Sequence, residues 1–165
     1  MRKCALALAA ATCLLAASDT WADSATAVIA ISANVRKNCL ISTTAVAYGA
    51  YDPVAANATA PLDATGTVVL TCTKGTTASI GLDGGANAQG PTRRMANGTA
   101  SFLTYELYQD NAHTVIWTNA GSGMLTIPSA PSKEPRSFTV YGRVAGAQDV
   151  PVGNFTDSVV ATVNF

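Results

Sequence analysis

Two cysteines of this 165-residue chain have the type and spacing for covalent chemistry. Cys4 and Cys13 lie in an apolar N-terminal leader, so Cys39 and Cys72 are the pair that remains after processing. In an oxidising compartment such a pair most simply forms a disulfide. Closing a loop of about 33 residues would stabilise the fold by roughly 3–4 kcal/mol. A metal pair or free thiols are the alternatives, but His113 is distant in sequence and the chain has no C-x-x-C element.

Other residues with catalytic potential lack the partners that catalysis needs. His113 has only Asp110 as a nearby carboxylate, which indicates a loop histidine and not a base. No serine stands in a Gly-x-Ser-x-Gly elbow, and the turn 83–85 lacks the alternating carboxylates of a calcium loop. Arg93 and Arg94 follow a Gly-Pro turn and are expected to be solvated. We therefore expect no enzyme activity, no cofactor and no metal site.

The N-terminus has the pattern of a secretory signal. A basic start, Met1 to Lys3, precedes an apolar run from Ala5 to Ala17, and Thr20-Trp21-Ala22 offers small residues for cleavage after Ala22. The run is too short to span a bilayer, which takes about 20 residues. A lipoprotein through Cys13 and an uncleaved anchor are weaker alternatives. Residues 1–22 are therefore predicted to be a signal peptide, and the mature protein to be exported.

The mature chain has the composition of a secreted β domain. Removing residues 1–22 leaves eight of ten basic and nine of ten acidic residues, a net charge of about −1. This near-neutral charge does not indicate binding to nucleic acid or to an anionic membrane surface. Gly, Thr, Ala and Val are abundant, which disfavours long helices. Four tyrosines could form a sugar-binding surface, but packing in the core and sheets explains them more simply: Tyr51, Tyr105, Tyr108 and Tyr141.

Period-2 alternation and turn residues predict seven short strands after the N-terminal segment. Their expected ranges are 40–48, 65–73, 78–82, 102–109, 114–117, 138–144 and 159–165. The faces expected to be buried carry Val68, Leu70 and Cys72; Leu103, Tyr105 and Leu107; and Phe138, Val140, Gly142 and Val144. Short strands separated by turn chemistry are typical of an immunoglobulin-like β-sandwich.

The start of the mature chain carries its own alternating β pattern. One face of the segment 26–35 bears Ala27, Ile29, Ile31, Ala33 and Val35. No turn-and-return signal follows before Cys39, so no hairpin partner lies next to it. Such a terminal strand can pair within its own sheet or complete the sheet of another molecule.

Several short blocks, in order along the mature chain, resemble the spore coat protein U domain, the subunit fold of archaic chaperone–usher pili. They are Asn38-Cys39, the turn 48–53, Thr71-Cys72, the strand 103–108, Trp117, the strand 139–144 and the terminal block 151–165. The turn begins with Tyr48 where the family often has Phe, and Trp117 lacks the usual following glycine.

The resemblance implies an immunoglobulin-like domain, residues 36–165, that lacks one strand and is completed by donor-strand exchange. Residues 23–35 would be the donor segment, with Ala27, Ile29, Ile31, Ala33 and Val35 entering the groove of a neighbouring subunit. A periplasmic chaperone, an outer-membrane usher and other pilus subunits would be the partners. The protein would then be a structural pilus subunit at the cell surface, used in attachment and biofilm formation.

Two other functions stay open from the sequence. A lectin-like adhesin or tip subunit would normally need a second domain, for which the chain has no room. A secreted or coat protein with a self-completed sandwich would use the segment 26–35 as its own first strand.

Overall fold

The computed structural model of the protein describes residues 22–165, which form two units divided between Asn34 and Val35. The predicted signal peptide, with Cys4 and Cys13, lies outside the described residues except for Ala22. Residues 22–38 form no helix or strand, so the β pattern of 26–35 is not realised as a strand within this chain. A strand needs a neighbour for its backbone hydrogen bonds, and whether another copy supplies it stays a prediction.

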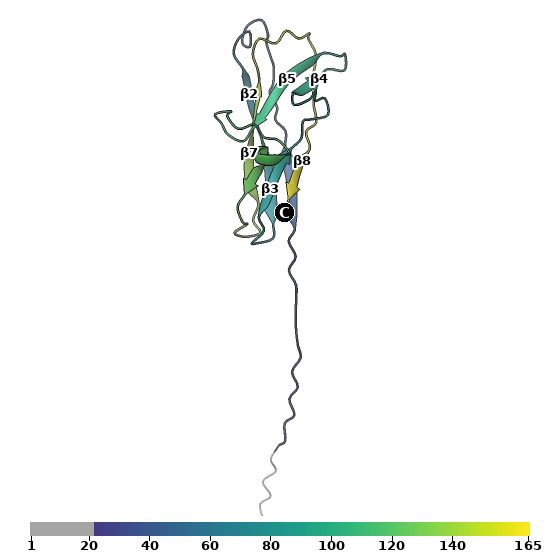
Figure 1. Ribbon diagram of the computed structural model, residues 1–165, viewed down its shortest axis with the longest axis vertical. Coiled ribbons are helices and arrows are strands. Elements are labelled where there is room, and N and C mark those ends of the chain that lie inside the picture. The colour runs from purple at the N-terminus through teal and green to yellow at the C-terminus, as the bar shows by residue number, and fades with distance from the viewer. Residues whose placement is uncertain (1–21) are drawn as a thin grey trace, which may run out of the picture. The chain divides into compact units, whose positions relative to one another are not determined.

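Residues 35–165 form the all-β sandwich that the sequence predicts (Figure 1). The strands are β1 (Cys39–Thr44), β2 (Leu62–Cys72), β3 (Ala78–Leu82), β4 (Arg93–Ala96), β5 (Phe102–Tyr108), β6 (Leu125–Ile127), β7 (Arg136–Val144) and β8 (Ala161–Asn164). One sheet has the order β1-β2-β7-β5-β4 and the other the order β6-β3-β8, with antiparallel pairing throughout. A single 3₁₀ turn, Gly121–Gly123, stands between β5 and β6 within the described residues.

The buried faces follow the predicted alternation. Val68, Leu70 and Cys72 of β2 are at most 3% exposed, and Val140 and Val144 of β7 are buried opposite exposed or half-buried neighbours. Trp117 is fully buried, and its indole N–H donates to the carbonyl of Ile80 over 2.9 Å. The core therefore lies between the two sheets, where burial of apolar side chains supplies the main stabilising free energy.

Strand boundaries and three elements differ from the sequence-based prediction. The prediction of a strand at 114–117 is wrong: Ile116 makes only an isolated bridge to Tyr108, because the chain then turns Trp117 into the core. β4 and β6 were not predicted. β4 begins with two arginines and β6 has three residues, so neither shows the alternation on which strand prediction depends.

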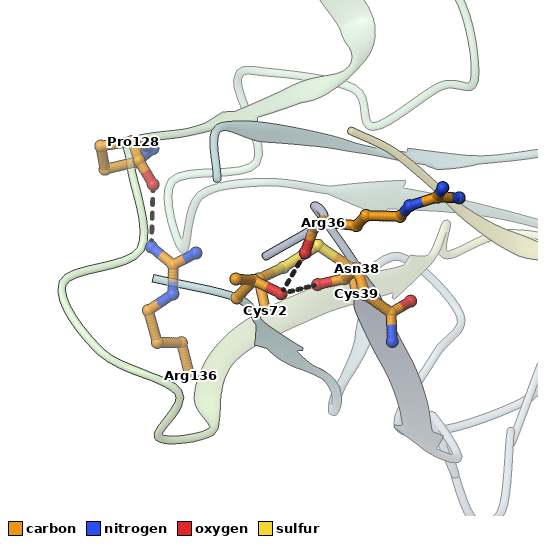
Figure 2. The surroundings of a disulfide bond; sticks show 7 residues. Arg36, Asn38, Cys39, Cys72, Pro128 and Arg136 are labelled. Atoms are coloured by element: carbon orange, nitrogen blue, oxygen red, sulfur yellow. Dashed lines mark hydrogen bonds between the residues drawn. A yellow bond between two sulfur atoms is a disulfide. The ribbon is translucent and has the colours of Figure 1, made fainter. Parts of the chain in front are cut away.

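A disulfide joins the first two strands, as Figure 2 shows. Cys39 and Cys72 lie directly opposite each other in the β1–β2 register, with Cα atoms 4.1 Å apart. The neighbouring Thr73 donates its backbone N–H to the Asn38 carbonyl over 2.9 Å and its hydroxyl to the Arg36 carbonyl over 3.2 Å. The crosslink and these hydrogen bonds fix the point at which the N-terminal segment joins the domain.

The expectation that Arg93 is solvated is wrong. Its side chain is 3% exposed, and its guanidinium donates to the carbonyls of Leu82, Asp83 and Trp117 and to the carboxylate of Glu106. These acceptors come from both sheets and from the segment after β5. Burial of the cation is tolerated because it is paired and hydrogen-bonded on all sides, an arrangement that sequence neighbours cannot reveal.

Candidate functional site: an open groove between the sheets

The candidate site is an apolar groove whose two walls belong to different sheets. One wall is β1 with the segment 43–48, and the other is the segment 155–161 leading into β8. Among the described residues β1 pairs only with β2, and β8 only with β3, so each wall keeps one free edge. A free edge presents unpaired N–H and C=O groups to any chain that can lie against it.

The groove is deep enough to take side chains. Its floor comes from β2, β3, β4, β5 and β7, through Val68, Leu82, Met95, Leu107 and Val140. This part encloses about 320 Å³, roughly ten times the volume of a water molecule in the liquid. A second, wider part continues toward the loops 49–53 and 150–154, and the two parts share Val46, Tyr48, Met95, Phe155 and Thr156. The two parts therefore adjoin along these residues, and the first of them is the more apolar.

The first wall leaves its sheet at the end of β1 because two glycines make room for it. A Cβ at Gly66 would lie 2.8 Å from Val46, and one at Gly142 would collide with Val46 and the Tyr48 hydroxyl. The chain therefore crosses the inner face of β2 and β7 at these two positions. Among the described residues, 45–50 form no backbone hydrogen bond, so this stretch of wall is unpaired.

The second wall is held in place by both sheets. Thr156 exchanges two backbone hydrogen bonds of 2.9 Å with Ala96 of β4, and further along Val160 is bonded to Asp83 at the end of β3. The carboxylate of Asp157 accepts hydrogen bonds from Tyr105 over 2.6 Å and from the side chain of Asn87 over 3.0 Å. This wall thus keeps a fixed distance from the floor without being paired along its groove side.

Two tyrosine side chains, Tyr48 and Tyr105, line the trough among its polar groups. The Tyr105 hydroxyl donates to Asp157, whereas the buried Tyr48 hydroxyl has no partner among the described residues. Burial, followed by the hydrogen bond to Asp157, raises the pKa of Tyr105 far above its ordinary value of 10.0. Burial, followed by the charge of Glu106, raises the pKa of Tyr48 in the same direction. Both hydroxyls are therefore held in their neutral form.

These shifts predict a loss of stability in alkali. Because the folded-state pKa values of Tyr48 and Tyr105 are raised, their contribution is present below pH 10 and is lost as the pH rises above it. The two tyrosines should therefore ionise together with unfolding, seen as a step in tyrosinate absorbance that coincides with the loss of circular dichroism. Tyr105→Phe should make the stability of the fold less dependent on pH above pH 10. If the loss of stability above pH 10 were the same in that variant, the role given to Tyr105 would be wrong.

The predicted donor residues lie in the described N-terminal segment with their side chains exposed. Ile29 is 83% and Ile31 91% exposed, and Val35, at the start of the domain, is 82% exposed. Ala27 and Ala33 are exposed as well. Large aliphatic side chains in such number are seldom left in water without a partner. Their role as a donor strand stays a prediction.

His113 lies in a turn, as the sequence predicts, but with partners that the sequence did not reveal. Its ring packs edge-on against Tyr108 at 5.0 Å and Tyr141 at 6.4 Å, and its Nε2 lies 3.8 Å from the Asp63 carboxylate. Asp63 in turn accepts two 2.7 Å hydrogen bonds from Arg143. The contacts of His113 with Tyr108, Tyr141 and Asp63 therefore hold the turn 109–116 against the strands.

The four tyrosines do not share one surface. Tyr105 is buried against Asp157, while Tyr108 and Tyr141 flank His113. The Tyr51 hydroxyl donates to the Ala145 carbonyl over 3.0 Å and accepts from the backbone N–H of Gln148. Each ring is accounted for by packing or hydrogen bonding within the fold.

Residues 22–165 contain no group of three or more side chains able to hold a metal ion. These residues also form no helix that is long and apolar enough to cross a membrane.

The chain belongs to the Spore Coat Protein U domain family, whose model matches residues 25–162. A curated relative, Protein U of Myxococcus xanthus, is 36% identical over 173 residues, covering 96% of this chain and 95% of that protein. The resemblance noted from the sequence is therefore confirmed, and it extends over almost the whole chain.

A solved structure shows the same fold. It is the crystal structure of the CsuC-CsuE chaperone-tip adhesion subunit pre-assembly complex from archaic chaperone-usher Csu pili of Acinetobacter baumannii. One of its chains superposes with a TM-score of 0.56 at 20% identity, over 79% of this chain. The present chain spans 40% of the length of that chain. At this identity the likeness supports the immunoglobulin-like sandwich alone.

Proposed function

We propose that this protein is a structural subunit of an archaic chaperone–usher pilus that polymerises by donor-strand exchange. The open groove between β1 and the segment before β8 carries the proposal. Each subunit would offer this groove to the N-terminal segment 23–35 of the next one. The resulting fibre would serve surface attachment and biofilm formation after passage through the periplasm.

The donor segment has the chemistry that the groove requires. A strand laid between the two free edges would form main-chain hydrogen bonds with the walls, and alternate side chains would enter the trough. Ala27, Ile29, Ile31, Ala33 and Val35 share the face that would point inward. Burying the two isoleucines and the valine would contribute about 5–9 kcal/mol before ordering costs, at roughly 1.5–3 kcal/mol each.

The partners follow from the same exposed groove. Before assembly the trough would need a temporary occupant, because an apolar edge left open promotes aggregation. The structural relative was crystallised as a chaperone–subunit complex, which supports a periplasmic chaperone in this role. An outer-membrane usher would then exchange the chaperone for the next subunit.

The second candidate is a coat protein with a self-completed sandwich. The 36% identity with Protein U, over almost the full length of both proteins, favours it. In that case the segment 26–35 would fold back into its own groove.

The two candidates differ in the behaviour of the purified mature chain. As a pilus subunit, residues 23–165 alone should self-associate, and co-expression with the cognate chaperone should give a one-to-one complex. A synthetic peptide of residues 24–36 should restore a soluble monomer, whereas the same peptide with Ile31→Asp should not. The mature chain could instead be a stable monomer that does not bind the peptide and whose residues 26–35 are protected from hydrogen exchange. This result would contradict polymerisation and favour the coat protein.

A further inference from the structure

Most of the cations of the domain gather at one of its ends, while the opposite end carries only acidic charges. The first end holds the disulfide, and the segments 35–38, 73–77 and 128–136 meet there, since Cys39 pairs with Cys72 and Leu70 with Arg136. We call it the cationic end. It carries Arg36, Lys37, Lys74, Lys133 and Arg136, against Glu134 as the one acidic side chain of these segments. These are five of the eight cations in residues 23–165 (10 in the chain less Arg2 and Lys3).

Four of the five cations of this end are free to meet a partner. Arg36, Lys37, Lys74 and Lys133 are exposed, and among the described residues none of the five lies within ion-pair distance of a carboxylate. Figure 2 shows Arg36 and Arg136 beside the disulfide, with Arg136 bonded to the Pro128 carbonyl at 2.9 Å.

The opposite end has the reverse character. It is formed by the loops 45–61, 97–101 and 145–155, at the edge where Leu62 pairs with Val144. We call it the acidic end. Its loops contain the exposed Asp52 and Asp149 and no lysine or arginine. The nearby Asp63 and Arg143 neutralise each other through two 2.7 Å hydrogen bonds.

The acidic end is also where the groove widens. Asp52 lines the wider part of the trough, together with Val150, the residue after Asp149. The donor segment runs to Val35, and the next two residues are Arg36 and Lys37 of the cationic end. A donor strand that leaves a neighbour's groove through this wider part would bring Arg36 and Lys37 to the end that carries Asp52 and Asp149.

We infer that the cationic end of one copy docks on the acidic end of the copy that accepts its donor segment. The inference rests on the proposed polymerisation and adds a second, electrostatic contact to it. Complementary charge at such a contact mainly speeds encounter and rejects the wrong orientation. Its range is set by a Debye length of about 8 Å at physiological salt.

Zero-length carbodiimide crosslinking of wild-type polymers tests the contact directly. The ends of one copy are separated by the length of β2, eleven residues or about 35 Å, so a bond between them must join two copies. Peptide mass spectrometry should find Lys37 joined to Asp52 or Asp149 in polymers and not in single chaperone-bound subunits. Polymers that form without any such bond would overturn the docking inference alone. Absence of polymers from wild-type protein would overturn the proposed function and the contact with it.

Charge variants measure the effect on assembly. Asp149→Lys should slow polymer growth about tenfold at low salt, and Lys37→Asp in the same chain should restore it. Added salt should shrink the difference, because it screens exposed charges. Asp149→Asn, which removes the charge without reversing it, should slow growth less than Asp149→Lys. Equal rates for all variants, at every salt concentration, would overturn the inference.

Discussion

Replacing Ile31 with aspartate is expected to abolish the donation of the N-terminal segment. The variant would lose roughly 1.5–3 kcal/mol of aliphatic burial. It would also have to bury an unpaired carboxylate in an apolar trough, or leave the groove part-filled, which adds several kcal/mol. A combined loss above about 3 kcal/mol lowers the affinity of the segment for the groove more than 100-fold. Heat-resistant ladders and surface fibres should therefore disappear.

Ser32→Asp is the matched control for this experiment. The neighbouring side chain points to the opposite face of an extended strand, so its charge would stay in water. The Ile31→Asp subunit should still fold and bind its chaperone, because its own groove is intact. Normal assembly of Ile31→Asp with failure of Ser32→Asp would mean that the strand faces are assigned the wrong way round. Normal assembly of both variants would mean that this segment is not the donor.

Removing the disulfide is expected to lower the free energy of unfolding by about 3–4 kcal/mol. The bond closes a 33-residue loop and so restricts the unfolded chain. Cys39→Ala together with Cys72→Ala isolates this effect, since both side chains are buried and a serine would add an unpaired hydroxyl. The urea midpoint of the mature chain should fall, and less subunit should be exported.

The oxidation state of the wild-type protein provides the control. Intact mass should rise by two hydrogens on reduction, and the native protein should not react with a thiol reagent. Alkylation of both thiols without reductant would show that the bond is absent. An unchanged urea midpoint in the double variant would show that the bond does not stabilise the fold.

The alternation of apolar residues determined most of the sandwich. Ala78–Leu82 is predicted residue for residue, and the buried faces of β2, β5 and β7 are those read from the sequence. These segments pack one face on the core and leave the other half-exposed. Because successive side chains of a strand point to opposite faces, apolar residues recur at every second position. The cysteine pair and the alternating isoleucines of the N-terminal segment are likewise evident from residue type and position.

Side-chain partners from distant segments could not be read in this way. The sequence predicted a solvated Arg93, because the residues that accept its hydrogen bonds are distant from it along the chain. They are Leu82, Asp83, Glu106 and Trp117. Trp117 looked like the end of a strand, because nothing nearby in sequence shows that its indole reaches Ile80.

The sequence by itself predicted the class of fold, the disulfide pair and the alternating segment that we propose as a donor, since local alternation and residue type encode them. Only the tertiary structure decided that β1 and β8 keep free edges on either side of an apolar trough. Gly66 and Gly142 let one wall cross the sheet, and Asp157 holds the other in place. The division of charge between the two ends likewise became visible only once distant loops had been brought together. A groove and a charged end are made by segments that meet in space, so no single stretch of sequence contains them.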